Sequence, residues 1–310
     1  MRAVHDGAAA DEMLHVPSAE AKMIMQSRWS SFDGSTLLVL ATAGGVQIWD
    51  KDGKYMVFVF AFDAAHVTMP QGPAAHDIFA RGIASTDGPE AQVLCVGTSM
   101  GEIVVFDRAS GDKFSLSTVL RKHAAAICCL DADGVCLASA DDEGAICTWD
   151  LGRMKLEATM AACGSPCTSL ILGNDDTFGR DLILAGFASG HIRLFSRSAQ
   201  SIVCELAAHA RAVMSVACAP EHPGMFASAG EDTCIHLWQL TNSGGGGEGK
   251  GGGGDSVATG ESLSVRLMDT MTVGNGVVTG IQFVAGDSPA NPSIVVASYD
   301  VDKLSVFEVR

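Results

Sequence analysis

The sequence is poor in positive charge and has no long apolar run. Lysine and arginine number 20 against 36 aspartate and glutamate residues, which gives a formal net charge of −16. Nucleic acids and anionic lipids are bound largely by Lys and Arg side chains that neutralise phosphates, so this balance excludes both as main partners. The apolar runs, such as LLVLA and EIVVF, are far shorter than the roughly 18 residues of a membrane span. We therefore expect no membrane insertion, and protein partners that are basic or neutral.

Other absences narrow the class of protein further. The N-terminal stretch has no continuous apolar core, which excludes a secretory signal and favours a cytoplasmic location. The 10 cysteines lack the spacing of a disulfide scaffold, and most lie in apolar runs, where Cys behaves as a small hydrophobe. Cys163 and Cys167 have the wrong spacing for a zinc knuckle. The glycine-rich run around Lys250 lacks the Ser or Thr that follows the lysine of a phosphate-binding loop. We predict no metal site and no cofactor.

What the sequence does contain is an internal repeat. Six short stretches place an aromatic residue after alternating side chains: GGVQIWD, GEIVVFD, GAICTWD, GHIRLFS, TCIHLWQ and DKLSVFE. A run of small and apolar residues precedes each stretch, for example VLCVGTS before the second and MFASAGED before the fifth. Most neighbouring aromatic residues are about 43 positions apart. Each pair of runs predicts a β-hairpin, and the period indicates a repeat protein.

This repeat resembles the WD-repeat β-propeller family, in which each blade is a four-stranded antiparallel sheet. The resemblance predicts an all-β fold with six recognisable blades, and a seventh is not excluded. The propeller domain is expected at residues 22–310, with a glycine-rich insertion at 243–256, after an N-terminal segment at 1–21. A narrower resemblance to one branch of the family begins at about Lys22 and rests on DIFARGIAS, QVLCVGTSMGEIVVFD, AAHARAV and SAGEDTCIHLW.

The strands of one unit and the closure of the ring can also be predicted. In the third unit we expect strands at residues 124–130, 135–140, 145–150 and 154–160. The sixth unit ends with its third strand, so its outermost strand has to come from elsewhere, and residues 13–16 are a spare apolar segment that would close a six-bladed ring. Alternatively the ring needs a further blade, and its open edge would then invite pairing with another chain.

The stretch FASAGEDTCIHLWQL at residues 226–240 gathers several reactive side chains and raises the question of an active site. The resemblance implies a structural role instead, because WD repeats link a His, a Ser or Thr, an Asp and a Trp in a hydrogen-bonded chain. In the fifth unit the matching residues are His209, Ser228, Asp232 and Trp238. In the third unit they are His123, Ser139 and Trp149, with Glu143 in the place of the Asp. We therefore predict no catalytic residue.

The resemblance implies a non-catalytic scaffold for protein–protein interaction, a subunit of a larger multiprotein assembly. Single-disc WD-repeat propellers recur in ciliary and other microtubule-associated complexes, so a cilium or flagellum axoneme is the expected setting within the cytoplasm and its cytoskeleton. The alternative is a substrate-recruiting receptor of a cullin-type ubiquitin ligase. Such receptors commonly carry Trp-Asp-any-Arg at the end of a third strand, whereas here Arg153 follows Trp149 and Asp150 one place late.

The candidate partner-binding residues are His76, Arg81 and Arg211, which accompany the long connection at residues 61–75. Arginine presents five donors in a fixed fork and is enriched at binding hot spots, so we expect Arg81 and Arg211 to hold an acidic or carbonyl-rich partner segment. The alternative is that these arginines pair with acidic turn residues of neighbouring blades, such as Glu143 or Asp232.

Overall fold

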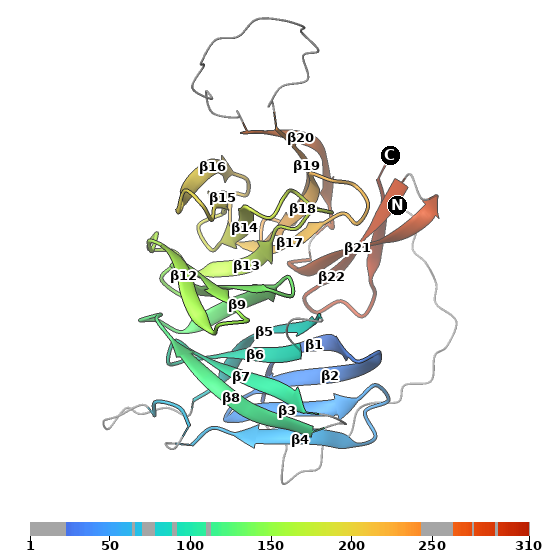
Figure 1. Cartoon of the computed structure of the whole chain (residues 1–310). Coiled ribbons are helices and arrows are strands. Elements are labelled where there is room, and N and C mark those ends of the chain that lie inside the picture. The colour runs from blue at the N-terminus through green and yellow to red at the C-terminus, as the bar shows by residue number, and fades with distance from the viewer. Residues whose placement is uncertain are drawn as a thin grey trace, which may run out of the picture.

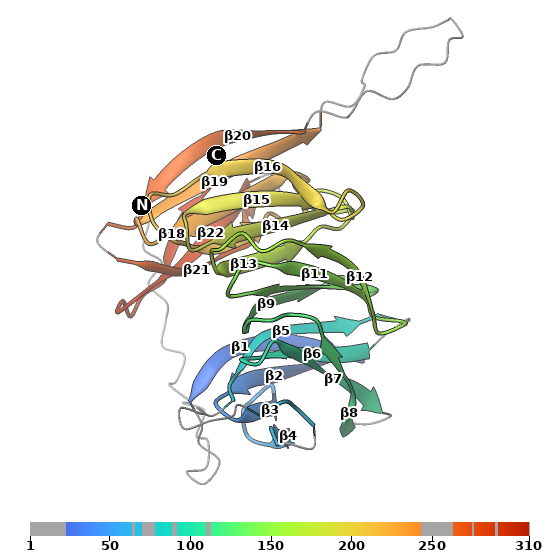
Figure 2. The ribbon, with the colours of Figure 1, turned by 90° about the vertical axis from the view of Figure 1, so that its left-hand side faces the viewer.

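The computed structural model describes residues 23–63, 66–69, 78–88, 92–109, 113–242, 263–274, 276–288 and 291–309. All regular elements in these residues are β-strands, and they form six antiparallel sheets in chain order. Figures 1 and 2 show the sheets following one another, from the first in blue to the sixth in red. An all-β propeller with six blades is thereby confirmed.

In each of the first three sheets, four consecutive strands pair in chain order. The first sheet consists of β1 (Ile24–Phe32), β2 (Ser35–Thr42), β3 (Gly45–Asp50) and β4 (Met56–Ala61). The second consists of β5 (Ala80–Asp87), β6 (Gln92–Thr98), β7 (Glu102–Ala109) and β8 (Lys113–Arg121). The third consists of β9 (Ile127–Ala132), β10 (Cys136–Asp141), β11 (Ile146–Asp150) and β12 (Lys155–Met160). Strands β9 to β12 overlap the four strands predicted for the third unit, although β9 begins three residues later than predicted.

The fourth and fifth sheets repeat this order, whereas the sixth has three strands within the described residues. The fourth consists of β13 (Cys167–Leu172), β14 (Leu182–Phe187), β15 (His191–Ser196) and β16 (Ser201–Ala207). The fifth consists of β17 (Val213–Cys218), β18 (Met225–Gly230), β19 (Cys234–Asn242) and β20 (Leu263–Thr272). The sixth consists of β21 (Val278–Ser288), β22 (Asn291–Ser298) and β23 (Ser305–Glu308). The predicted closing segment at 13–16 and the insertion at 243–256 lie outside the described residues.

The hydrophobic core lies between the sheets rather than in one central mass. Each strand alternates its side chains between two faces, and both faces of an interior sheet are covered by neighbouring sheets. One cluster joins the first and second sheets around Phe32 and Phe106, and the next joins the second and third around Ile103 and Trp149. Further clusters follow between the third and fourth, fourth and fifth, and fifth and sixth sheets. Packing between consecutive sheets therefore supplies the core.

Steric constraints explain why a glycine precedes most of the strands that end in an aromatic residue. Gly144 and Gly190 have φ angles of 80° and 83°, in the left-handed region that favours glycine. A Cβ atom at either position would also strike a backbone oxygen of the segment that enters the next blade, that of Ser165 or His209. The fifth unit has Thr233 at this place, and it adopts the same region with a φ of 68°. The repeat therefore begins with glycine because the turn and the neighbouring blade both need it.

The innermost strands pack in the order β1, β5, β9, β13, β17 and β21. The second strand of each sheet also packs against the innermost strand of the next, from β2 with β5 to β18 with β21. Within the described residues, neither β21 nor β22 packs against β1 in the same way. Among the described residues, the six sheets therefore form an arc whose first and last members each have one packed neighbour.

Adding a methyl group where two sheets lie in close contact tests this packing. A Cβ atom at Gly97 on β6 would collide with the Ile127 side chain and the Arg81 carbonyl oxygen, whereas one at Gly280 on β21 would meet nothing within 4 Å. We expect Gly97→Ala to lower the free energy of unfolding by about 1 to 3 kcal/mol, because overpacking forces the neighbouring sheets apart. Gly280→Ala is the matched control and should leave stability unchanged or slightly raised. Urea denaturation of both variants checks this, and equal effects would contradict the packing described.

Candidate functional site

The polar side chains of the fifth blade form a continuous chain of hydrogen bonds. The Trp238 Nε1–H group donates to Ser228 Oγ at 2.9 Å, and Ser228 Oγ lies 2.8 Å from His209 Nε2. On its other side, His209 Nδ1 lies 3.0 Å and 3.2 Å from the two carboxylate oxygens of Asp232. The structure thus brings together all four residues that the sequence places in this set.

The donors in this chain run in one direction when His209 is neutral. Trp238 donates to Ser228, the Ser228 hydroxyl donates to Nε2, and the Nδ1–H group donates to Asp232. The Asp232 carboxylate also accepts the backbone N–H groups of Ala210 at 2.9 Å and Cys234 at 3.2 Å. Burial opposes ionisation of Asp232, but these hydrogen bonds and that of His209 outweigh it and lower the pKa of the carboxyl group. The chain therefore ties two turns to the interior of the blade.

The third blade has the same chain with a different acid from the one predicted. His123 Nε2 lies 2.7 Å from Ser139 Oγ, which accepts the Trp149 Nε1–H group at 2.8 Å. The carboxylate at His123 Nδ1 belongs to Asp141, at 2.7 Å, and not to Glu143. Glu143 is exposed at the tip of the turn, and its backbone N–H donates to Asp141 Oδ1 at 3.1 Å. The assignment of Glu143 to the chain does not agree with this geometry.

A single glycine explains why the two blades differ. In register with Asp141, the fifth blade has Gly230, where a Cβ atom would crowd the His209 ring and Asp232 Oδ1. A glycine at the strand end leaves room for the carboxylate of Asp232 to reach the histidine from the tip of the turn. In the third blade that space is filled by Asp141 itself. The identity of the strand-end residue is the sequence signal that would have found the correct acid.

The serine, histidine and aspartate of these blades have the order of a catalytic triad, but the serines cannot meet a substrate. Ser139 and Ser228 are 0% exposed, and each Oγ already accepts a Trp N–H group. A nucleophile must reach the substrate within hydrogen-bond distance of its base. The arrangement satisfies buried polar groups, each of which would cost about 1 to 3 kcal/mol if left without a partner.

Five of the ten cysteines are buried and the other five are partly buried. Burial raises the pKa of the Cys95, Cys136 and Cys218 thiols to about 12. Cys163 and Cys167 donate to the carbonyl oxygens of Ser165 and Ser169 at 3.6 Å and 3.4 Å. Among the described residues, no three His, Cys, Asp or Glu side chains gather where a metal ion would need them. Likewise, no helix in that part of the chain has the length and apolar character to cross a membrane.

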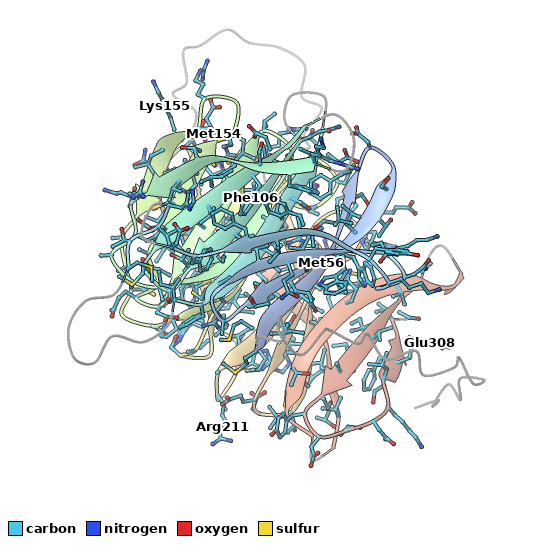
Figure 3. All side chains as sticks on the ribbon, turned by 90° about the horizontal axis from the view of Figure 1, so that it is seen from below. Met56, Phe106, Met154, Lys155, Arg211 and Glu308 are labelled. Atoms are coloured by element: carbon cyan, nitrogen blue, oxygen red, sulfur yellow. The ribbon has the colours of Figure 1, made fainter. Side chains whose placement is uncertain are left out.

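The candidate partner-binding residues are not brought together by the described contacts. Arg81 on β5 forms an ion pair with Asp142 of the third blade at 3.7 Å, which links neighbouring blades next to Glu143. Arg211 lies just before β17, is exposed, and stands out at the periphery of the molecule in Figure 3. It makes no ion pair within the described residues. His76 lies outside them, as does most of the connection at 61–75.

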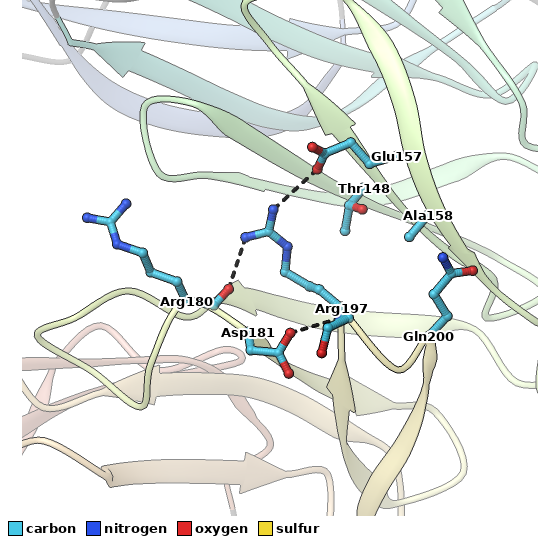
Figure 4. Close-up of a pocket in the computed structure, with 8 residues that line it drawn as sticks. Thr148, Glu157, Ala158, Arg180, Asp181, Arg197 and Gln200 are labelled. Atoms are coloured by element: carbon cyan, nitrogen blue, oxygen red, sulfur yellow. Dashed lines mark hydrogen bonds and ion pairs between the residues drawn. The ribbon is translucent and has the colours of Figure 1, made fainter.

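A surface groove between the third and fourth blades was not predicted. It has a volume of about 470 Å³ and is crossed by Arg197, which pairs with Glu157 at 3.3 Å and donates to the Arg180 carbonyl oxygen at 2.9 Å (Figure 4). The Thr148 hydroxyl at its base has no hydrogen-bond partner. Arg180 and Asp181 come from the connection between β13 and β14, which is longer here than in the third blade. That extra length is a sequence signal for the groove.

Comparisons with known proteins agree with this fold. A family model described as WDR54 matches residues 8–286. WD repeat-containing protein 54 of Mus musculus is 32% identical over 246 residues, which cover 76% of this chain and 69% of the mouse protein. WD repeat domain 54 of Rattus norvegicus is 29% identical over 310 residues, covering 96% and 83% of the two chains. The branch of the WD-repeat family indicated by the repeat stretches is therefore confirmed.

A solved structure supports the fold alone. One chain in a crystal structure of the mitotic checkpoint complex superposes with a TM-score of 0.65 and is 18% identical, with 94% of this chain and 79% of that chain covered. At this identity the likeness concerns the arrangement of the strands and nothing about partners.

Substitutions of Asp141 and Glu143 test which acid belongs to the hydrogen-bonded chain of the third blade. We expect Asp141→Ala to lower the free energy of unfolding by about 1 to 3 kcal/mol, since His123 and two turn N–H groups lose their acceptor. Glu143→Ala is the matched control two residues away and should change it by less than about 0.5 kcal/mol. Asp232→Ala should behave like Asp141→Ala in the fifth blade. Thermal and urea unfolding measure all three, and equal losses for Asp141→Ala and Glu143→Ala would contradict the geometry.

The buried histidines predict a loss of stability in weak acid. Burial lowers the pKa of His123 and His209 and outweighs the adjacent aspartates, which act in the opposite direction. The unfolded chain then takes up protons that the folded chain does not, so stability is complete above about pH 6.5 and falls as the pH drops towards the folded pKa values. Each histidine should contribute up to about 1.4 kcal/mol per pH unit.

Replacing one of these histidines tests this pH dependence. His209→Gln should flatten the decline in unfolding free energy between about pH 6.5 and pH 5, relative to the parent protein. Urea denaturation at a series of pH values gives the slopes. An unchanged slope in His209→Gln would remove that histidine as the cause.

Proposed function

The chain belongs to the WDR54 family of WD-repeat proteins, and on this premise we propose that it is a non-catalytic scaffold for protein–protein interaction. It would act as a subunit of a larger multiprotein assembly. One observation carries this proposal. The Ser, His and Asp side chains of the third and fifth blades form hydrogen bonds with one another inside the fold. What the molecule then offers to other molecules is its surface.

We propose that Arg81 and Arg211 both take part in partner docking, as the sequence suggests. The support is that both arginines are accessible on a chain with a net charge of −16, and that the guanidinium of Arg211 has no ionic partner among the described residues. Arginine is enriched at interface hot spots because it can donate several hydrogen bonds in a fixed geometry. The ion pair between Arg81 and Asp142 is long, at 3.7 Å, and half-exposed, so a partner carboxylate can compete with it. His76 belongs to the same proposal.

The proposed setting is the cytoplasm, within a ciliary or flagellar axonemal assembly. Its support is the recurrence of single-disc WD-repeat propellers in such complexes. The alternative function, a receptor of a cullin-type ubiquitin ligase, stays a prediction. The Arg153 side chain that such a motif would use pairs with Asp150 at 2.8 Å on the surface of the third blade.

Affinity purification from ciliated cells tests the proposal. The tagged chain is captured at low and physiological salt, and the co-purified proteins are identified by mass spectrometry. We expect Arg81→Ala/Arg211→Ala to reduce partner capture about tenfold without changing the melting temperature. Arg180→Ala/Arg266→Ala is the matched control, because it removes two exposed arginines that lie elsewhere on the surface.

The outcomes separate the alternatives. Axonemal proteins that depend on Arg81 and Arg211 support the proposal, whereas cullin adaptors favour the receptor function. Full capture by the Arg81→Ala/Arg211→Ala variant returns both arginines to a structural role. Turnover of a substrate by the purified chain would overturn the non-catalytic assignment.

A further inference from the structure

The groove between the third and fourth blades has a polar residue at its base where the other blades have an apolar one. Thr148 lies on β11, one residue before Trp149. The residue at the same place in the first, second, fourth and fifth blades is aliphatic and at most 4% exposed: Ile48, Val105, Leu194 and Leu237. Each of these four side chains packs in a cluster against the following sheet. An apolar side chain is therefore sufficient for the fold here, and the packing does not explain the hydroxyl of Thr148.

This hydroxyl is buried and unpaired. Thr148 is 1% exposed, and its Oγ1 atom forms no hydrogen bond within the described residues. Most buried polar groups in folded proteins have a hydrogen-bond partner, because an unpaired one loses its hydration without compensation. A buried hydroxyl that lines a groove is therefore a group that a bound molecule can satisfy.

Small residues beside Thr148 open the groove. Across the sheet, Thr148 lies in register between Ala138 on β10 and Ala158 on β12. The fourth strand has a larger residue at the place of Ala158 in the other blades just compared: Phe58, Thr118, Cys204 and Asp269. Figure 4 shows Thr148 and Ala158 on the side of the third blade, with Arg197 and Gln200 on the side of the fourth. The volume of about 470 Å³ between them is large enough for a protein side chain.

The charged side chains of the groove already have partners. Two are positive and two are negative: Arg180, Arg197, Glu157 and Asp181. Glu157 and Arg197 pair with each other across the two blades at 3.3 Å, and Arg180 pairs with Asp175 at 2.9 Å. The Asp181 carboxylate accepts the Ser196 hydroxyl at 2.6 Å and the Ser198 N–H group at 2.8 Å. The lining therefore has no net charge with which to attract an anion or a cation.

An uncharged polar group suits this groove better than a charged one. A charged group loses more hydration on burial, and the lining does not compensate for that loss. A carboxamide has an acceptor and two donors, so it can pair with a hydroxyl in either role. Building on the scaffold function, we propose that the groove binds the side chain of an Asn or Gln residue of a partner protein. Its carboxamide pairs with the Thr148 hydroxyl, and its methylene groups pack on Ala158.

The test uses the purified full chain and three planar molecules of the same shape: propionamide, propionate and propionamidinium. Titrations are followed by the methyl NMR signals of Thr148 and Ala158. Propionamide should shift both signals saturably, with a dissociation constant on the order of tens of millimolar for so small a ligand. The anion and the cation should bind at least about fivefold more weakly. Equal binding of the three probes would overturn the proposal, and if none shifts these signals, water alone satisfies the hydroxyl and the proposal is wrong.

A variant that keeps the shape of the groove isolates the hydroxyl. Thr148→Val should weaken propionamide binding about fivefold, read at the Ala158 methyl signal. Its melting temperature should be unchanged or raised, because the hydroxyl has no partner in the fold. Thr98→Val is the matched control for stability and should lower the melting temperature, since Thr98 is 0% exposed and its Oγ1 accepts the N–H groups of Met100 and Glu102. Undiminished binding by Thr148→Val would overturn the proposal.

A second variant fills the groove. Ala158→Leu places a larger side chain beside Thr148 and should abolish the saturable shift of the Thr148 signal, with the fold checked by the melting temperature. Binding at the parent affinity in this variant would place propionamide elsewhere and overturn the proposal. Failure of propionamide binding together with capture of cellular proteins that depends on Arg81 and Arg211 would leave the scaffold function standing and remove only the groove.

Discussion

The structure depends on the burial of apolar side chains on both faces of each sheet. A four-stranded sheet with apolar side chains on both sides cannot be stable alone, and neighbouring sheets meet this need in five successive interfaces. Small residues on the second strands, such as Gly97 and Gly186, let the sheets approach until backbone and side chains touch.

The buried polar chains serve the same packing. His123 and His209 stand where a loop enters the interior of a blade, and each would be costly to bury without partners. The chain from Trp to Ser to His to Asp gives every polar atom a partner and holds the loop and the turn in place. Ser, His and Asp side chains, which in other proteins often indicate catalysis, here make two blades more rigid.

The sequence predicts much of this architecture and part of the site. A period near 43 residues with aromatic-ended strands is strong enough to predict the sheets and their order. The resemblance to the WD-repeat family, and not the period, implies the hydrogen-bonded chain of His209, Ser228, Asp232 and Trp238. The acid of the third blade was wrong because alignment compares positions along the chain, whereas Asp141 and Asp232 reach the histidine from different points of the turn. The groove at Arg197 depends on which sheets lie side by side, and no local pattern contains that information.

The interrupted packing also bears on how the chain unfolds. When each sheet contacts only the sheets before and after it, stability is a sum of terms for single sheets and for nearest neighbours. Within the part of the chain that the structure describes, the four interior sheets each have two such neighbour terms, and the first and sixth have one. The ends of the arc are therefore the lowest-energy points of local opening, and the third and fourth blades are the last to open. A segment that bridges the two ends would turn a linear array into a ring and make unfolding cooperative throughout.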